Sequence, residues 1–194
     1  MKLRKTQIIE AALDIISMEG IKNCTTRRLA EKVGVTEPAL YRHFKNKDHI
    51  LSEVCRFDTA RSEKHISAVM NNEDIGPVEK LRKVFITLCE YFNSNPSSSA
   101  VIFSEEIFRD QDKLSATVWK TMQKRQQLLS NIIKEGQRLG EIDSSIDSED
   151  MAFIFQGALR LLVSRWRLSK YNFDLKERGE RLGESLLKLL SSKK

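Results

Sequence analysis

Residues 25–47 hold an unusual concentration of cationic and hydrogen-bonding side chains, in the sequence TTRRLAEKVGVTEPALYRHFKNK. Arginine can donate two parallel hydrogen bonds to a guanine edge or a phosphate, and hydroxyl, imidazole and ammonium groups can donate single bonds to phosphate oxygens. These groups therefore favour recognition of a polyanion such as duplex DNA. The side chains that carry them are Arg27, Tyr41, Arg42, His43 and Lys47.

Two short helices are predicted to position these groups. A threonine pair can cap the first helix, whose apolar face begins at Leu29. Gly34 provides a turn, and Pro38 suits the first turn of the second helix, because the missing amide costs nothing there. Leu40 and Phe44 lie four residues apart and form one face of that helix. Together with a preceding apolar helix that ends near residue 20, the pattern predicts a helix-turn-helix.

The exposed side of the second helix should enter a groove of DNA. At about 100° per residue, Arg42 points away from the apolar Leu40 and Phe44. The N-terminal residues of such a recognition helix contact base edges in the major groove. We expect Arg27 and Arg42 to read guanine. The expected phosphate contacts are Tyr41, His43 and Lys47.

The rest of the chain also predicts helices, so the expected fold class is all-α with about nine helices. Only three prolines and eight glycines occur, and no long stretch alternates apolar and polar residues. The stretch NSNPSSS, residues 93–99, is expected to be a loop of turn-forming residues. Further helices are expected at about residues 47–70, 77–92, 100–109, 112–139 and 175–190, and another begins at an Asp147 or Ser148 cap and includes residues 151–163.

Two C-terminal helices predict a homodimer. The helix at 151–163 is apolar on nearly every side and needs cover all round, which a second subunit could supply. A two-fold symmetric four-helix interface is expected, and the alternative is that both helices form the core of a monomer. The residues expected at the interface are Leu159, Leu162, Trp166, Gly179, Leu182, Gly183, Leu186 and Leu189.

Charge and composition exclude several classes of protein. The first 50 residues hold ten basic and six acidic side chains, so they carry a net charge of +4 out of +6 for the whole chain. This asymmetry is typical of a polyanion-binding module joined to a more neutral body. No apolar stretch long enough for a membrane span occurs, and acidic residues interrupt the N-terminal apolar pattern. A cytoplasmic, nucleoid-associated protein without membrane contact is therefore expected.

Enzymatic chemistry finds no support in the sequence. Three widely separated cysteines form no CxxC pair, and none of the three histidines has a metal-like partner spacing. No GxSxG, HExxH or phosphate-binding loop is present. We expect no enzyme activity, no metal and no cofactor.

Residues 25–47 resemble the helix-turn-helix signature of TetR-type regulators. The match includes the Gly-Val corner, the Tyr-x-His-Phe end and the lysine that opens the next helix, and it covers about 45 residues. The resemblance implies a DNA-binding domain at 1–46 and a helical effector-binding and dimerisation domain at 47–194. It also implies that DNA contacts come from Thr26, Arg27, Thr36, Glu37, Pro38, Ala39, Tyr41, Arg42, His43 and Lys47.

Glu37 departs from the neutral residue common at its position. Its carboxylate could accept a hydrogen bond from a cytosine amino group, or it could only favour the positive end of the helix dipole.

The same resemblance implies an effector cavity in the C-terminal body. We expect a repressor that a small hydrophobic or aromatic molecule releases from a palindromic operator. The alternative is a ligand-independent DNA-bound protein of the nucleoid-occlusion type, which recruits a protein partner. A basic group lies at residues 160–167. It could form ion pairs at the interface or bind an anionic effector. The expected cavity residues are Phe85, Cys89, Phe92, Phe103, Phe108, Trp119, Met122, Phe153 and Phe155.

Overall fold

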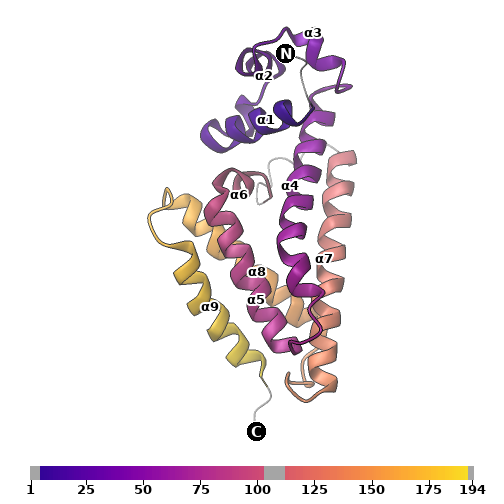
Figure 1. Cartoon of the computed structure of the whole chain (residues 1–194), viewed down its shortest axis with the longest axis vertical. Helices are drawn as coiled ribbons and strands as arrows, with labels where there is room; N and C mark the ends of the chain where they lie inside the picture. Colours follow the sequence, from indigo (N-terminus) through magenta and orange to yellow (C-terminus); the bar gives the residue numbers. More distant parts are fainter. Residues whose placement is uncertain (1–4, 103–111, 192–194) are drawn as a thin grey trace. The chain divides into compact units, whose positions relative to one another are not determined.

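The computed structural model describes residues 5–102 and 112–191, and these residues are almost entirely helical (Figure 1). This described part of the chain forms nine α-helices and one short 3₁₀ turn, which confirms the expectation of an all-α fold. The elements are α1 (Lys5–Glu19), η1 (Ile21–Asn23), α2 (Thr26–Val33), α3 (Glu37–Tyr41), α4 (Lys47–Met70), α5 (Pro77–Ser94), α6 (Pro96–Ile102), α7 (Asp112–Arg138), α8 (Ser148–Leu168) and α9 (Leu175–Leu190).

The chain divides into two compact units. Unit 1 consists of Met1–Arg61 and Asn95–Trp119, and unit 2 consists of Ser62–Ser94 and Lys120–Lys194. Helix α4 starts in unit 1 and ends in unit 2, and α6 belongs to unit 1 although α5 before it belongs to unit 2. The predicted domain boundary between residues 46 and 47 stays a prediction.

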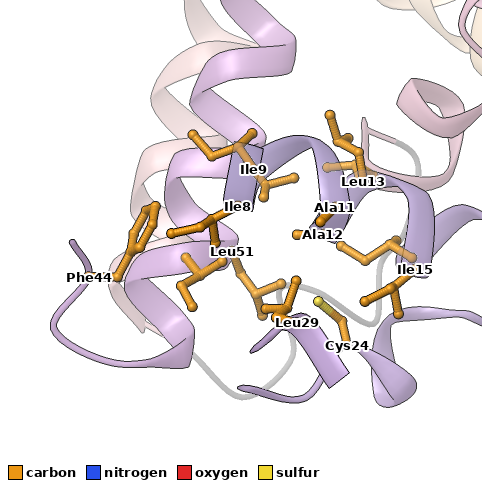
Figure 2. Packing of buried hydrophobic residues seen from close by; sticks show 14 of the residues in the cluster. Ile8, Ile9, Ala11, Ala12, Leu13, Ile15, Cys24, Leu29, Phe44 and Leu51 are labelled. Carbon is orange, nitrogen blue, oxygen red and sulfur yellow. The ribbon is translucent and has the colours of Figure 1, made fainter. Parts of the chain in front are cut away.

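Unit 1 has one apolar core that α1 organises. The buried face of α1 includes Ile8 and Ala12, which are both fully buried. Figure 2 shows side chains of α1 gathered with Leu29 of α2 and Leu51 of α4. Phe44, which follows α3, is 1% exposed and joins the same core. Helices α2 and α3 are short, so this shared core holds them in place better than their own hydrogen bonds could.

The stretch at residues 93–99, which the sequence analysis predicts to be a loop, is helical on both sides of Asn95. Helix α5 continues to Ser94 and α6 starts at Pro96, so the expected helix at about residues 100–109 begins earlier. Proline at the first position of a helix loses no hydrogen bond, which explains this start. Residues 103–109 of the expected helix lie outside the described residues.

Helix α6 packs on α1 and is also bonded to α4 within unit 1. The Ser98 hydroxyl donates a hydrogen bond to the Asp58 carboxylate, and both side chains are almost fully buried. The Arg61 guanidinium donates to the Asn95 side-chain oxygen at 2.8 Å. A hydrogen bond to a buried carboxylate is costly to break, so α4 and α6 are firmly joined at this point.

Unit 2 is built around the contact of α5 with α9, which α8 also touches (Figure 1). Two glycines of α9 allow this close approach. A Cβ atom at Gly179 would lie 2.5 Å from the Cys89 Sγ of α5, and one at Gly183 would lie 3.3 Å from the Phe85 ring. A separation of 2.5 Å is well inside van der Waals contact, whereas 3.3 Å is only slightly tight.

This difference predicts two unequal alanine variants. Gly179→Ala should lower the free energy of unfolding by about 1–3 kcal/mol, because the added methyl group forces α5 and α9 apart. Gly183→Ala should change it by less than about 1 kcal/mol, because the gain in helix propensity offsets the small clash. Urea unfolding followed by circular dichroism measures both, and the opposite order of stabilities would contradict this packing.

Candidate nucleic-acid interface

Local signals in the sequence set the bounds of α2. The Thr25 side chain accepts a hydrogen bond from the Arg28 backbone N–H at 3.3 Å and caps the start of the helix. Gly34 ends it with φ 71° and ψ 38°, the left-handed conformation that glycine adopts without strain. Chain reversal at Gly34 then brings α3 next to α2.

Helix α3 has one buried and one exposed side. Leu40 is fully buried and Phe44, just beyond the helix, is 1% exposed, so this pair anchors the segment in the core. Tyr41 is 48% exposed and Arg42 is exposed on the other side. The helix ends at Tyr41, but the Phe44 N–H still donates to the Leu40 carbonyl at 3.1 Å, so the helical path continues for one more turn.

The two arginines predicted to read guanine differ in their surroundings. The Arg42 guanidinium has no hydrogen bond or ion pair with any residue that the structure describes, and it is available to a ligand. The Arg27 Nε lies 3.0 Å from a carboxylate oxygen of Glu31. Both partners of this pair are largely exposed, and such pairs contribute little, so Arg27 can exchange Glu31 for DNA at small cost.

Two other basic residues of α2 form surface ion pairs with α1. Arg28 forms an ion pair with Glu19 at the end of α1. The Lys32 Nζ lies 3.3 Å from a carboxylate oxygen of Asp14 on α1. Neither ion pair is predicted from the sequence, although the acids of α1 and the bases of α2 are visible there.

Lys47 is the first residue of α4, where the positive end of the helix dipole repels its cationic side chain. The preceding Asn46 caps this helix, since its side-chain oxygen accepts from the His49 backbone N–H at 2.8 Å. A phosphate at this end would interact favourably both with the helix N-terminus and with the Lys47 ammonium. The Asn46 cap is not among the sequence-based predictions, although asparagine is one of the residue types that favour this position.

A polar contact connects α2 and α3. The Thr26 hydroxyl donates a hydrogen bond to Glu37 Oε2 at 2.6 Å. Each of these residues is the first of its helix, and both are half-buried. Glu37 therefore holds a defined position at the start of α3.

The ten predicted DNA contacts all belong to unit 1, and none of them is buried. Thr36 and Pro38 are exposed, and Ala39 and His43 are half-buried. The fold of unit 1 therefore leaves the whole predicted set accessible.

The predicted cavity residues fall into three groups. Phe85 and Phe155 meet edge to face with ring centroids 5.2 Å apart inside unit 2, where Cys89 and Phe92 are also buried. The side chains of Trp119, Met122 and Phe153 are 60%, 43% and 72% exposed, so they do not join that interior. Phe103 and Phe108 lie outside the described residues.

Unit 2 also contains polar interior contacts that sequence reasoning missed. The Arg125 guanidinium donates to the fully buried Ser62 hydroxyl at 2.6 Å. The Ser130 and Ser148 hydroxyls lie 2.9 Å apart, and both side chains are buried. An apolar periodicity search passes over such serines because it scores only apolar positions.

The predicted dimerisation residues are mostly covered by their own chain. Within the chain, Leu182 is half-buried and Leu189 is 76% exposed. The Trp166 indole N–H donates to the Phe173 carbonyl at 3.0 Å and closes the turn between α8 and α9. Six of the eight residues are buried within their own chain, and their place at an interface stays a prediction: Leu159, Leu162, Trp166, Gly179, Gly183 and Leu186.

The opposite side of α8 is apolar and exposed. We call it the α8 stripe: Phe153, Ile154, Leu161 and Leu168, which are 72%, 51%, 63% and 84% exposed. At about 100° per residue these four side chains fall within one arc of the helix, and Gly157 lies at its centre. Nothing lies within 4 Å of the position that a Cβ atom of Gly157 would take. The stripe is open to a close neighbour.

The cysteines are unsuited to nucleophilic chemistry. Burial raises the pKa of the Cys24 thiol to about 11, against the opposing effect of the Lys47 charge. Burial, with the smaller effects of the Asp58 and Glu90 carboxylates, raises the pKa of Cys55 and of Cys89 to about 12. A thiolate is the reactive form, and near neutral pH these thiols are protonated.

Two further kinds of site are absent from the described parts of residues 5–102 and 112–191. No three His, Cys, Asp or Glu side chains come close enough together there to hold a metal ion. Nor does any helix in these ranges combine the length and the apolar character that crossing a bilayer requires.

Two protein families match the chain. Residues 8–54 match the family described as "Bacterial regulatory proteins, tetR family". Residues 76–192 match "MAATS-type transcriptional repressor, C-terminal region", which covers most of unit 2. The first match includes α2, α3 and the first turns of α4.

Individual proteins are also similar to this chain, at 22–26% sequence identity. The chain is 22% identical over 191 residues to the "Probable acrEF/envCD operon repressor" of Escherichia coli (strain K12), covering 95% of this chain and 86% of the relative. It is 26% identical over 132 residues to the nucleoid occlusion factor SlmA of Alteromonas mediterranea, covering 68% and 67% of the two chains.

Among solved structures, FadR from Bacillus subtilis in complex with stearoyl-CoA is similar with a TM-score of 0.84, at 22% identity, covering 95% of this chain and 98% of that one. KstR2 of Mycobacterium tuberculosis, a ketosteroid transcriptional regulator, is similar with a TM-score of 0.81, at 16% identity, over 100% and 97% of the two chains. At these identities the likeness concerns the fold.

Proposed function

The chain belongs to the TetR family of bacterial regulatory proteins, and we propose that it is a homodimeric repressor that a small apolar ligand releases from a palindromic operator. The observation that carries this proposal is the exposed side of α3. Its Arg42 guanidinium is available to a ligand, while Leu40 and Phe44 lock the helix into the core from behind. This activity is binding and needs no catalytic residue. It suits a cytoplasmic, nucleoid-associated protein.

The predicted DNA contacts fall into two groups, one for bases and one for phosphates. The first turn of α3 and Arg42 are proposed to enter the major groove, where arginine can bind guanine through two hydrogen bonds. Thr36, Pro38 and Ala39 approach the same groove with the start of this helix. Lys47 and the α4 N-terminus are proposed to bind a phosphate together with Tyr41 and His43, which fixes the register of the helix on the duplex.

Dimerisation is proposed to use the α8 stripe and the exposed Leu189 of α9. A row of large apolar side chains on one arc of a helix is the kind of surface that a second copy covers. Gly157 at its centre allows the partner helix to approach closely. Two copies related by a two-fold axis then present two recognition helices to half-sites about 34–36 Å apart.

The effector is proposed to be a hydrophobic or aromatic molecule that unit 2 binds. The buried aromatic pair of Phe85 and Phe155 supports an apolar class of ligand. Helix α4 runs from unit 1 into unit 2, and α6, which is bonded to α4 through Asp58 and Ser98, belongs to unit 1. A ligand that shifts either helix would change the spacing of the two recognition helices. A ligand that binds 100-fold more tightly to the dimer with widely spaced recognition helices favours that state by about 2.7 kcal/mol.

The proposal is tested by selecting fragments of the source genome with the purified full-length protein. The expected result is a set of enriched fragments that share an inverted repeat with half-sites about 10–10.5 base pairs apart. Stearoyl-CoA is a reasonable first probe for release of such a fragment, because the similar FadR structure contains it. Failure to enrich any sequence over random competitor would contradict the proposal.

A second candidate function is suggested by the similarity to SlmA, a nucleoid occlusion factor. In that case the DNA-bound protein would recruit a protein partner without an effector. The same selected fragments distinguish the two functions. Binding that no apolar ligand weakens, together with retention of a second protein on the complex, would favour recruitment over effector-controlled repression.

A further inference from the structure

His49 lies in the first turn of α4 and forms hydrogen bonds with the chain that precedes this helix. Its Nδ1 accepts a hydrogen bond from the Lys45 backbone N–H at 3.1 Å. Its own backbone N–H donates to the Asn46 side-chain oxygen at 2.8 Å. This resembles the reciprocal pattern of a capping box, in which glutamate or glutamine usually holds the position of His49. The imidazole therefore connects the first turn of α4 to the residues before it.

The same imidazole packs against the residue that anchors α3. Its ring meets the Phe44 ring with centroids 5.5 Å apart and an interplanar angle of 67°. Phe44 is 1% exposed and belongs to the core of unit 1 (Figure 2). The Lys5 Nζ lies 5.3 Å from the Phe44 ring centroid and 3.0 Å from a carboxylate oxygen of Glu53. His49 of α4 thus contacts a side chain that α1 also holds in place.

The chain between α3 and α4 is restrained by hydrogen bonds along its length. The His43 and Phe44 backbone N–H groups donate to the Leu40 carbonyl at 2.9 and 3.1 Å. The next backbone N–H, that of Lys45, donates to His49. Successive backbone groups are thus bonded first to α3 and then to α4. The conformation of this connection sets the distance from α3 to the start of α4.

Only an imidazole with an unprotonated Nδ1 can accept the bond from Lys45. Such a nitrogen carries a lone pair, whereas both nitrogens of the charged ring donate. The hydrogen bond therefore places the ring proton on Nε2, and Nδ1 does not donate to a phosphate in this arrangement. What the bond supplies is restraint, and a restrained binding surface loses less entropy when DNA binds.

The restrained connection lies between two predicted DNA contacts. Arg42 comes directly after α3, and Lys47 is the first residue of α4. Phosphate contacts fix the register of a base-reading helix on the duplex. A change in the distance between α3 and the start of α4 would therefore weaken the phosphate contact, the base contact or both.

We propose that His49 is a positioning residue for DNA binding, and that its imidazole holds the Lys47 ammonium and the start of α4 at a set distance from the recognition helix. This inference rests on the proposed function and deepens it by adding a residue outside the ten predicted contacts. The sequence pattern did not indicate His49, because its role depends on a hydrogen bond that it accepts within the fold.

The test uses two matched variants of the full-length protein. His49→Phe keeps an aromatic ring against Phe44 but has no acceptor, whereas His49→Gln has an acceptor but no ring. Fluorescence anisotropy at several salt concentrations measures binding to a DNA fragment that wild type selects. His49→Phe is expected to bind about 3- to 10-fold more weakly, with its base preferences kept and a salt dependence lower by about one phosphate contact. His49→Gln should bind like wild type, because glutamine can accept in a capping box.

Removal of Lys47 identifies the group through which His49 acts. In a Lys47→Ala background, His49→Phe should weaken binding by less than about 2-fold, because the contact that His49 positions is already lost. Circular dichroism checks that each variant is folded, and His49→Leu replaces His49→Phe if the phenylalanine variant does not fold.

Three outcomes would overturn the inference. His49→Phe could bind like wild type, or His49→Gln could bind as weakly as His49→Phe, and in both cases the accepted hydrogen bond has no role. Equal losses with and without Lys47 would show that His49 acts independently of the phosphate contact. Each of these outcomes leaves the proposed function intact, whereas a wild type that prefers no sequence over random competitor contradicts the proposed function itself.

Discussion

The Leu161→Glu variant is expected to sediment as a monomer and to bind operator DNA at least about 100-fold more weakly than wild type. Leu161 lies within the α8 stripe and is 63% exposed in the single chain. Covering a leucine contributes about 1.5–3 kcal/mol, and a two-fold interface contains two copies of it. An unpaired carboxylate in the same place adds a desolvation cost. A monomer then binds one half-site and loses the linked second contact.

Met18→Glu is the matched control for this variant. Met18 is 81% exposed on α1 in unit 1, so the same charge is placed on an apolar residue that belongs to no proposed interface. Analytical ultracentrifugation should show a dimer for Met18→Glu, and circular dichroism should show that both variants are folded. A Leu161→Glu protein that remains a dimer would refute the proposed role of the α8 stripe.

A glutamate at Leu186, another residue that the sequence predicts at the interface, has a different expected outcome. Leu186 is 5% exposed and packs inside unit 2. A glutamate there would bury an unpaired carboxylate inside the folded monomer. This would lower the free energy of unfolding, whatever the state of assembly. Loss of dimer in Leu186→Glu would therefore not identify an interface.

Arg42→Ala is expected to weaken operator binding by about 1–3 kcal/mol, or about 5- to 150-fold in Kd, while the protein stays folded and dimeric. The reason is that its guanidinium faces outward and contributes nothing to the core. If Arg42 contacts a base, its removal should also relax the sequence preference at one position of each half-site. Fluorescence anisotropy with operator and single-base variants measures both effects.

Arg56→Ala is the control for charge alone. Arg56 is an exposed arginine of α4 whose Nη1 lies 3.1 Å from Glu53, in a surface pair of small energetic value. If Arg42 only contacted a phosphate, its removal would weaken binding to all DNA sequences equally. It would also reduce the salt dependence of the affinity by the amount expected for about one phosphate contact. Equal losses for both variants would contradict a specific role of Arg42.

Local sequence signals were sufficient for the helix-turn-helix. Thr25 caps α2, Gly34 takes the left-handed conformation and Pro38 fits the first turn of α3, as their residue types predict. Such signals act within a few residues and need no knowledge of the rest of the fold. The same locality explains the error at residues 93–99, where turn-forming residues were assigned to a loop. Packing of α6 on α1 within unit 1 favours the helix there.

The sequence by itself determined that the chain is helical and that its second and third helices form a DNA-reading motif, and it predicted that α8 needs cover on all sides. Only the tertiary structure decided which side of α8 the chain covers for itself. A helix apolar all round has no periodicity that distinguishes inside from outside. Gly179 and Gly183 of α9 bring that helix close against α5. On α8, Leu162 and Trp166 are buried within the chain, whereas Leu161 is 63% exposed.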